Sequence, residues 1–413
     1  MVTFSFKLFG DSESRTILLE LHGEQGQIHE LRTPLRITKE MWDEQRQRPI
    51  NIYLKSCKRL NIRLDRMRIA IASYLDSIGW KFEKVSLKLL ASRIRKNVTV
   101  RSMTYDPKSL LGNINNYISS RAHLICTSTH KRYIVFFNLL QRFEGYRRRH
   151  LMIADVNAEF VREFLSYCKE EAYNNSTAYR TVNFVKTVLN HLEKRGIRTF
   201  VYELELPRER KNSTFITLSE DELVKIKRMD LPINLQAARD WLIISCYTGQ
   251  RVSDFMKFNH TMIENVAGQE CISFVQQKTQ RNILLPLHPA VLIIKSQNER
   301  HFPDKIPSKR YNEQIKEVVR LAGINGLVNI GKRIGFRVLR VAIPKWKAVT
   351  SHIGRRSFAS NFYGKIPTSL LMEATGHSSE QMFHRYINHI DTERIRSLQL
   401  HFEEAYRDKF LNK

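Results

Sequence analysis

Helix-period runs of apolar residues are the feature that most restricts how this chain can fold. Between residues 110 and 195, apolar side chains recur every three or four positions in four successive segments. Each segment begins near a Ser, Thr, Asn or Asp, the residues that best cap helix N-termini. We therefore expect a block of four helices over residues 110–120, 129–144, 157–172 and 176–195.

Short alternating segments predict small β-sheets on both sides of this block. Residues 2–9 alternate apolar and polar side chains, and 16–21 and 28–36 are further strand candidates. Later in the chain, 271–275 and 282–287 have the composition of a β-hairpin. The predicted fold class is therefore mostly α with small β-sheets, an α+β chain.

Further helices are expected outside the central block. Residues 54–78 have helical spacing, and Thr38 should cap a helix that carries Met41 and Trp42. Ser219 should begin another helix in the last part of the chain. The segment 323–349, rich in glycine and β-branched residues, gives no clear pattern, whereas helices are expected over 237–247, 252–258 and 311–322.

Two segments without periodicity divide the chain. The length of 413 residues suggests two or three domains. Residues 98–107 resemble a linker, and the polar, charged segment 207–214 is the clearest boundary. We expect domains over residues 1–100, 105–205 and 215–413.

A large positive charge indicates a polyanionic partner. The formal net charge is +27, and the span from Met41 to His150 holds 23 Lys and Arg against 7 Asp and Glu. Such an excess is unusual for a metabolic enzyme and typical of a protein that binds nucleic acid. The residues expected to contact DNA are Lys55, Lys58, Arg59, Arg63 and Arg66 on one helix, and Thr129, Lys131, Arg132, Arg147, Arg148 and Arg149 in the helical block; each could instead be a solvated surface side chain.

Cysteines and apolar runs add only exclusions. The five cysteines lie far apart and have neither zinc-ligand spacing nor the pattern of a disulfide framework, so we expect scattered, buried thiols. The N-terminus does not resemble a signal peptide, and no apolar run approaches 18 residues. These features predict a soluble, cytoplasmic protein.

A set of cationic and phenolic side chains in the last 170 residues predicts chemistry on a phosphodiester. His352 and Arg355 form a His-x-x-Arg, His377 follows a glycine, and Tyr386 comes nine residues later. Upstream, Arg251 is followed by Asp254, and Lys278 stands at the predicted hairpin turn. Guanidinium groups match phosphate oxygens, and a phenol surrounded by cations is a competent nucleophile.

The order and spacing of these residues resemble the tyrosine recombinase/integrase family, whose members cut and rejoin DNA through a phosphotyrosine. The resemblance implies that Tyr386 is the nucleophile, that Arg251 and Arg355 bind the phosphate, and that Lys278 protonates the leaving 5′-oxygen. It further implies that His352 moves the tyrosine proton and that His377 hydrogen-bonds the phosphate. Asp254 would orient Arg251 and His352, and neither a metal nor another cofactor is required.

Within the family, the sequences H-I-G-R-R-S-F-A and T-G-H-S-S-E-Q-M-F most resemble integrases of Bacteroides-type mobile elements. Three residues depart from the commoner pattern, in which Leu is frequent at the positions of Gln250 and Thr375 and His at that of Arg356. None of the three removes a group that the reaction needs. The outline of the N-terminal part implies an arm-type DNA-binding domain followed by a helical, SAM-like core-binding domain.

The resemblance predicts integration and excision of a mobile element, with core and arm sites on double-stranded DNA as partners. A synaptic tetramer, accessory DNA-bending proteins and a nucleoid location follow from the same resemblance. The alternatives are a DNA invertase or resolvase, a relaxing enzyme of topoisomerase IB type, and a non-catalytic DNA-binding regulator. The tail beyond Tyr386 is expected to dock on a neighbouring protomer, or alternatively on its own domain, through Ile390, Ile395, Leu398, Leu400 and Phe402.

Overall fold

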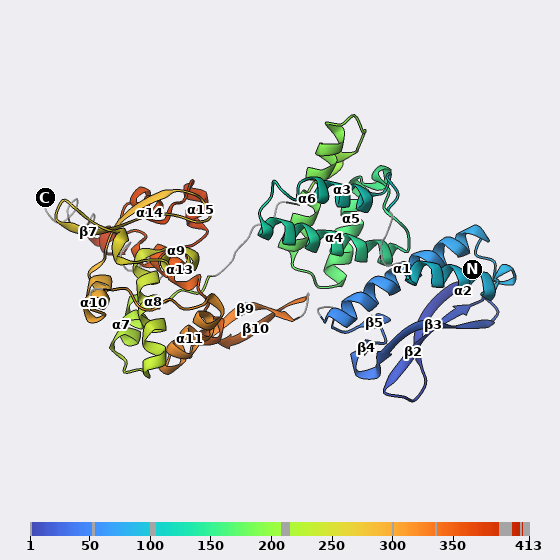
Figure 1. Ribbon diagram of the computed structural model, residues 1–413, viewed down its shortest axis with the longest axis horizontal. Coiled ribbons are helices and arrows are strands. Elements are labelled where there is room, and N and C mark those ends of the chain that lie inside the picture. The colour runs from blue at the N-terminus through green and yellow to red at the C-terminus, as the bar shows by residue number, and fades with distance from the viewer. Residues whose placement is uncertain are drawn as a thin grey trace. The chain divides into compact units, whose positions relative to one another are not determined.

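The computed structural model describes most of the chain (Figure 1). The described residues are 2–51, 54–99, 105–207, 215–299, 301–334, 337–387, 399–404 and 407. The chain divides into two compact units, residues 1–209 with 332–339 and residues 210–331 with 340–413, so the main division falls between Glu209 and Arg210. This point lies inside the polar segment that the sequence marks as a boundary. The finer division into three domains stays a prediction.

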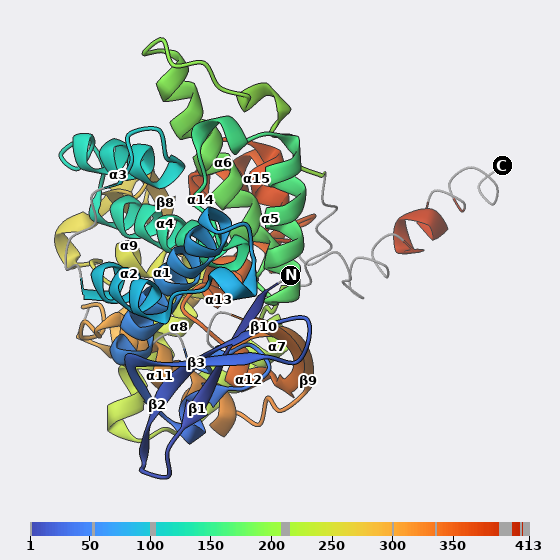
Figure 2. The ribbon, with the colours of Figure 1, turned by 90° about the vertical axis from the view of Figure 1, so that its right-hand side faces the viewer.

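The first unit begins with a three-stranded antiparallel sheet in the order β1-β2-β3. Phe4 and Phe6 of β1 point to the same side as Leu19 of β2 and pack into one core with Leu64 and Ile71 of the following long helix. Figure 2 shows the sheet with this helix beside it. The elements are β1 (Thr3–Phe9), β2 (Ser14–His22), β3 (Ile28–Thr38), β4 (Trp42–Asp43), β5 (Arg48–Pro49), α1 (Lys55–Ser77) and α2 (Leu87–Thr99).

The predicted strands and the first long helix are confirmed, but the helix expected after Thr38 is wrong. Only one 3-10 turn, Lys39–Met41, forms there, and Thr38 makes no side-chain cap. Trp42 instead begins β4, because its indole is buried in the core of this sheet and α1. The helix α2 was not predicted from the sequence.

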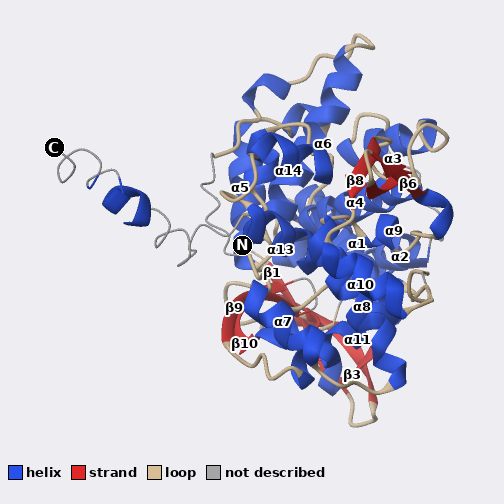
Figure 3. Cartoon of the chain, turned by 90° about the vertical axis from the view of Figure 1, so that its left-hand side faces the viewer, coloured by secondary structure: helices blue, strands red, loops and turns tan. Residues whose placement is uncertain are grey.

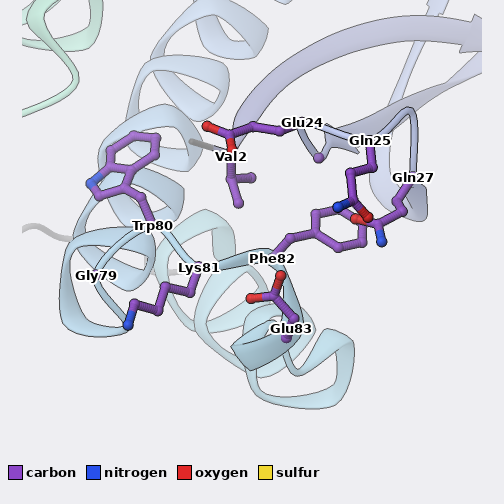
Figure 4. A pocket seen from close by; sticks show the side chains of 10 residues that line it. Val2, Glu24, Gln25, Gln27, Gly79, Trp80, Lys81, Phe82 and Glu83 are labelled. Carbon is purple, nitrogen blue, oxygen red and sulfur yellow. The ribbon is translucent and has the colours of Figure 1, made fainter.

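A hollow of about 610 Å³ opens at the end of this sheet (Figure 4). Trp80, Lys81 and Phe82, which follow α1, form one side of it, and the turn before β3 contributes Gln25 and Gln27. Phe82 is held by a stacked contact with His29, at 4.4 Å between ring centroids. None of these groups resembles the chemistry that the rest of the sequence predicts, so the hollow is not a candidate for the active site.

The second part of the first unit is the predicted block of four helices. Three of them begin at predicted capping residues or their neighbours, since the side chains of Ser109, Asn157 and Asn174 accept backbone N–H bonds from the first turns. A second core, rich in Phe and Tyr, lies among the helices. They are α3 (Leu110–Ser120), α4 (Thr127–Arg147), α5 (Ala158–Glu170) and α6 (Asn175–Glu193).

A buried ionic cluster joins the two parts of this unit. The Asp65 carboxylate on α1 lies 3.6 Å from the Arg48 guanidinium and 3.8 Å from that of Arg68. Burial raises the pKa of Asp65, and the two arginines oppose that rise. Helix α4 approaches closely at Gly145, where an added Cβ would lie 2.5 Å from Asp65. Glycine is therefore needed for this packing.

The second unit is built around α8 (Ile233–Thr248), whose first turn is largely exposed and whose side chains are buried almost continuously from Asp240 to Thr248. Helices α7, α10, α11 and α13 pack against it, and a separate antiparallel sheet has the order β6-β7-β8. Figure 3 shows these helices in blue and the short strands in red. The other elements are α7 (Glu220–Arg228), α9 (Val252–Phe255), β6 (Ile263–Val266), β7 (Gln269–Val275), β8 (Asn282–Pro286), α10 (Pro289–Gln297), α11 (Ser308–Leu321), β9 (Leu327–Ile334), β10 (Arg337–Pro344), α12 (Lys345–Ala348), α13 (Ile353–Phe362), α14 (Thr368–Thr375) and α15 (Glu380–His384).

Most predictions for this unit are confirmed. Ser219 caps α7 in a capping box with Glu222, and the hairpin β7–β8 has the expected position. Helix α9 ends at Phe255, earlier than the predicted Phe258. The segment without a clear pattern contains the two-stranded sheet β9–β10 and α12, and α10 was not predicted. Residues 388–398 of the proposed docking tail lie outside the described residues, whereas Leu400 and Phe402 are exposed.

Candidate active site

Arg355 is the buried centre of the candidate site. It lies on α13, and its side chain is fully shielded from solvent. One terminal nitrogen donates to the Gly249 carbonyl at 3.0 Å, and the other donates to the Thr375 carbonyl at 2.6 Å. These carbonyls stand at the C-terminal ends of α8 and α14, where unsatisfied oxygens and the helix dipole favour a cation.

Two glycines make these helix ends possible. Gly249 and Gly376 end α8 and α14 in the left-handed conformation, with φ of +67° and +69°. A Cβ on Gly249 would lie 2.6 Å from the Phe358 ring, and one on Gly376 would lie 2.6 Å from Gln276 Oε1. Both the backbone conformation and the close packing therefore require glycine.

His377 and Tyr386 lie against Arg355. The second terminal nitrogen of Arg355 also contacts His377 Nε2 at 3.1 Å, and the Arg355 Cζ lies 5.5 Å from the centre of the Tyr386 ring. The His377 and Tyr386 ring centroids are 4.9 Å apart. Burial, followed by the charges of Arg355, Arg251 and Arg281, lowers the pKa of His377 to about 3. His377 is therefore a neutral imidazole at neutral pH.

Burial and the neighbouring charge of Arg251 also lower the pKa of Arg355, to about 10. Its guanidinium remains protonated at neutral pH. Within the described ranges, no carboxylate lies within ion-pair distance of Arg355, although Asp254 acts on it from farther away, and its Nε has no hydrogen-bond partner. A buried cation without a carboxylate is costly unless an anion joins it.

The remaining predicted residues surround this centre. Arg251, which precedes α9, donates to Gln276 Oε1 at 3.1 Å. Lys278 is exposed on the β7–β8 turn. Burial lowers the pKa of His352, and the charges of Arg356, Arg355, Arg251 and Lys278 lower it further, so three arginines and the hairpin lysine act on this histidine.

Asp254 is bonded to the hairpin that carries Lys278, and its role in orienting Arg251 and His352 stays a prediction. Its Oδ1 accepts the backbone N–H of Gln277 at 3.0 Å, and its buried Oδ2 has no partner among the described residues. Among the described residues, the Asp254 side chain makes no hydrogen bond to Arg251 or His352. Asp254 therefore fastens the hairpin that carries Lys278 to α9.

Sequence reasoning missed residues that contact this site, among them Arg281, which donates to the His377 carbonyl at 3.1 Å, and Gln276. The Gln276 side chain is fully buried and bonds Arg251, Gln250 and the Thr375 carbonyl. The available signal was a pair of polar residues, Gln250 and Thr375, at positions where leucine is frequent. Periodicity could not reveal their partner, because Gln276 lies on a turn between strands.

The predicted DNA-contact residues, expected on one helix and in the helical block, fall into three groups. Lys55, Lys58, Arg59 and Arg63 are exposed along α1, and Arg66 is half-buried. Thr129, Lys131 and Arg132 lie near the start of α4, whereas Arg147, Arg148 and Arg149 lie at its end, about 24 Å away at 1.5 Å per residue.

Two members of the last group are already engaged within the protein. Arg147 pairs with Glu163 at 3.1 Å, and the Arg148 guanidinium stands 4.4 Å from the Phe4 ring centre. Arg149, Lys131 and Arg132 are exposed. The exposed cations are therefore the better candidates for phosphate contacts.

The described residues contain no group of three or more His, Cys, Asp and Glu that could hold a metal ion. All five cysteines are free, and four are buried as predicted. Cys126 is exposed, contrary to the prediction, because it precedes the first turn of α4 at the surface. None of the described helices is long and apolar enough to cross a membrane.

Comparisons with known proteins give the fold. The sequence profile of the phage integrase SAM-like domain matches residues 109–200, the span of α3 to α6. A Tn1549 transposon integrase in complex with transposon right-end DNA superposes with a TM-score of 0.52, at 12% identity, over 71% of this chain and 99% of that chain. The XerH site-specific recombinase bound to difH DNA gives 0.51, at 13% identity, over 83% and 96%.

The fold is that of the tyrosine recombinases and integrases. A lambda integrase dimer bound to a core site is also similar, at 18% identity and a TM-score of 0.49, over 67% of this chain and 95% of that chain. A search of curated proteins finds no match. Within this tyrosine recombinase fold, all six residues predicted to be catalytic lie in the second unit.

Proposed function

We propose that this protein is a site-specific tyrosine recombinase that cuts and rejoins DNA through a 3′-phosphotyrosine on Tyr386. The observation that carries the proposal is the buried Arg355, which has no carboxylate partner and contacts both His377 and the Tyr386 ring. A phosphodiester would supply the missing negative charge. The attacking tyrosine would then lie beside the phosphate that Arg355 holds.

We assign the steps of the reaction by the resemblance to the tyrosine recombinases. The Tyr386 oxygen attacks the phosphorus as its proton leaves towards His352, and Arg251 and Arg355 stabilise charge on the non-bridging oxygens. The bond to the 5′-oxygen breaks, and Lys278 on the hairpin turn donates the proton that this oxygen takes up. Rejoining is the reverse, with a 5′-hydroxyl of another strand as nucleophile. The cationic side chains supply the charge stabilisation, and we assign no metal or other cofactor.

Double-stranded DNA is the proposed substrate and partner. The net charge of +27 and the exposed cations on α1 and α4 support this assignment. The similar Tn1549 integrase and XerH were both solved with DNA. We assign core-site DNA to the four-helix block and the second unit, and arm-site DNA to the N-terminal sheet and α1.

The biological outcome we propose is integration and excision of a mobile element, most similar to those of Bacteroides. Two DNA-binding modules before the catalytic unit fit a reaction that uses two classes of site. Synapsis would use a tetramer in which the C-terminal tail docks on a neighbouring protomer, with accessory DNA-bending proteins. Inversion or resolution by the same chemistry is the second candidate, since XerH is a site-specific recombinase of this fold.

The test is to trap covalent complexes on DNA that carries a nick near the cleavage point and to sequence the attached DNA. The proposal predicts attachment at a recurring sequence that joins two different DNA molecules after resealing. Tyr386→Phe should bind the same DNA and attach to none. Junctions confined to inverted segments of one molecule would support the second candidate, and binding without attachment by the wild type would contradict both.

A further inference from the structure

Gln276 is the most fully bonded buried side chain beside the site. Its Oε1 accepts from Arg251 at 3.1 Å and from the Thr279 hydroxyl at 2.6 Å. Its Nε2 donates to Gln250 Oε1 at 2.9 Å and to the Thr375 carbonyl at 3.0 Å. All four hydrogen-bonding positions of this amide are thus used, and its orientation is fixed.

Gln250 continues the connection to both helix ends. Its Nε2 donates to the Thr248 carbonyl of α8 at 2.8 Å and to the Ala374 carbonyl of α14 at 2.7 Å. Leucine at this position could fill the space but could make none of these bonds. Through the two glutamines, the turn that carries Lys278 is tied to the same helix ends that hold Arg355.

Thr375 fixes where the proton of neutral His377 lies. The Thr375 hydroxyl donates to the Leu371 carbonyl at 2.6 Å, so it can only accept from His377 Nδ1, at 2.7 Å. His377 Nε2 faces a nitrogen of Arg355 that only donates, so Nε2 must accept. Both contacts require the proton on Nδ1.

We propose that Gln250, Gln276 and Thr375 form a positioning network for the proposed recombinase site. Gln276 and Gln250 fix the positions of Arg251 and of the Lys278 hairpin relative to the C-terminal ends of α8 and α14. Thr375 holds His377 in the Nδ1–H tautomer, so that its Nε2 lone pair orients Arg355. The inference rests on the proposed function for its kinetic consequences but not for its structural ones.

The tautomer is tested without DNA. In the full-length protein with ¹⁵N-labelled histidines, the His377 signals, identified by their loss in His377→Gln, should show a protonated Nδ1 and an unprotonated Nε2. Thr375→Val, which replaces the hydroxyl by a methyl group, should weaken this preference and raise the share of the Nε2–H tautomer, because only the Arg355 contact then favours the proton on Nδ1. Wild-type His377 in the Nε2–H tautomer would overturn this part of the proposal.

Thr248→Val is the matched control. Thr248 also ends a helix before a left-handed glycine, is also buried, and donates to the carbonyl four residues earlier, at 2.8 Å. Its hydroxyl contacts no proposed catalytic residue. Both variants should lose similar stability, but only Thr375→Val should slow single-turnover cleavage, by about tenfold, the effect of one hydrogen bond worth about 1.4 kcal/mol. If Thr248→Val and Thr375→Val changed the His377 tautomer and the cleavage rate equally, the proposed role of Thr375 would be wrong.

The hairpin connection is tested by rescue. Gln276→Met, similar in size but without the amide, should slow cleavage by about tenfold or more while leaving DNA affinity within about twofold. A substrate with sulfur at the 5′-bridging position needs no proton donor, so it should recover much of that loss. Gln250→Leu should behave alike, and the double variant should be little worse than Gln276→Met alone.

A slow Gln276→Met that the sulfur substrate does not recover would contradict the hairpin connection. A strictly additive double variant would contradict the network. If the wild type itself forms no covalent complex, the proposed function fails, while the histidine signals still decide the Thr375–His377 contact.

Discussion

The two units of this protein bury arginines in opposite ways. In the first unit, Arg48 and Arg68 are buried beside the Asp65 carboxylate, which lies 3.6 Å from Arg48 and 3.8 Å from Arg68, so both arginines share a carboxylate partner. In the second, Arg355 is shielded against helix-end carbonyls and a neutral His377, with Arg251 adding a second positive charge. Buried arginines thus occur once with a carboxylate partner and once without one.

The difference separates a structural role from a catalytic one. A paired buried charge can hold two elements together, and here it joins α1 to α4 at Gly145. An unpaired buried cation lowers stability, and helix-end carbonyls offset only part of its desolvation. Such a site is retained where an anion binds in the functional state, which is why strongly perturbed charges concentrate at active sites.

The largest expected effect on the cleavage rate comes from removing Arg355, the buried cation without a carboxylate partner. Arg355→Ala should slow single-turnover cleavage by about 10³–10⁵-fold, the range of a phosphate-clamping arginine. Because the substitution removes a buried charge without a carboxylate partner, the loss of stability should be much smaller than the loss of cleavage rate. Arg320→Ala, which breaks an exposed pair with Glu317, is the control and should leave the rate unchanged. Cleavage by Arg355→Ala at the control rate would remove Arg355 from the mechanism.

Lys278 should show the next effect, and one that sulfur can cancel. Lys278→Ala should slow cleavage by about 10²–10⁴-fold, the contribution of a positioned proton donor. Water has a pKa of about 15.7 and a thiol one of about 8.5, so a 5′-bridging sulfur leaves without that proton. The sulfur substrate should restore Lys278→Ala but not Tyr386→Phe, and Arg251→Ala only slightly. If Lys278→Ala cleaves the ordinary and the sulfur substrate equally slowly, His352 becomes the first candidate for the group that protonates the 5′-oxygen.

Changes in the cluster of Asp65, Arg48 and Arg68 should alter the stability of the fold rather than the cleavage rate. Asp65→Asn leaves Arg48 and Arg68 uncompensated and should lower the free energy of unfolding by about 3–5 kcal/mol. Asp76→Asn, at the exposed end of the same helix, should cost less than about 1 kcal/mol. Denaturant unfolding measures both. A large loss of cleavage by folded Asp65→Asn would show that the first cluster is not merely structural.

The smallest expected effect is on how the free energy of unfolding depends on pH. The pKa of His377 falls from 6.5 to about 3 on folding, so below pH 6.5 the unfolded chain binds a proton that the folded one does not. Its contribution therefore lowers stability as pH falls, by about 1.5 kcal/mol between pH 6.5 and 5. His377→Gln should flatten the pH dependence of unfolding by this amount, and exposed His401→Gln should leave it unchanged. An unaltered slope in His377→Gln would show that the imidazole is protonated in the folded state.

The sequence predicted what depends on local spacing. The helices around Leu242 and Phe164 have apolar faces that only a helical period explains, and Gly249 marks a helix end that tertiary packing also requires. Family order then indicated Arg355, His377 and Tyr386, which the structure brings together. Contacts between distant segments were not predictable in this way: Trp42 became a strand because of a core built from other elements, and Gln276 acquired its partners only through tertiary folding.

The most direct test of the account is to identify the residue that becomes attached to DNA. After nuclease digestion of a trapped complex, mass spectrometry should find the nucleotide on Tyr386, joined through a 3′-phosphate, with a free 5′-hydroxyl on the released strand. That result would identify the phenol beside the buried Arg355 as the nucleophile, as the account requires. Attachment to another residue, or through a 5′-phosphate, would contradict it.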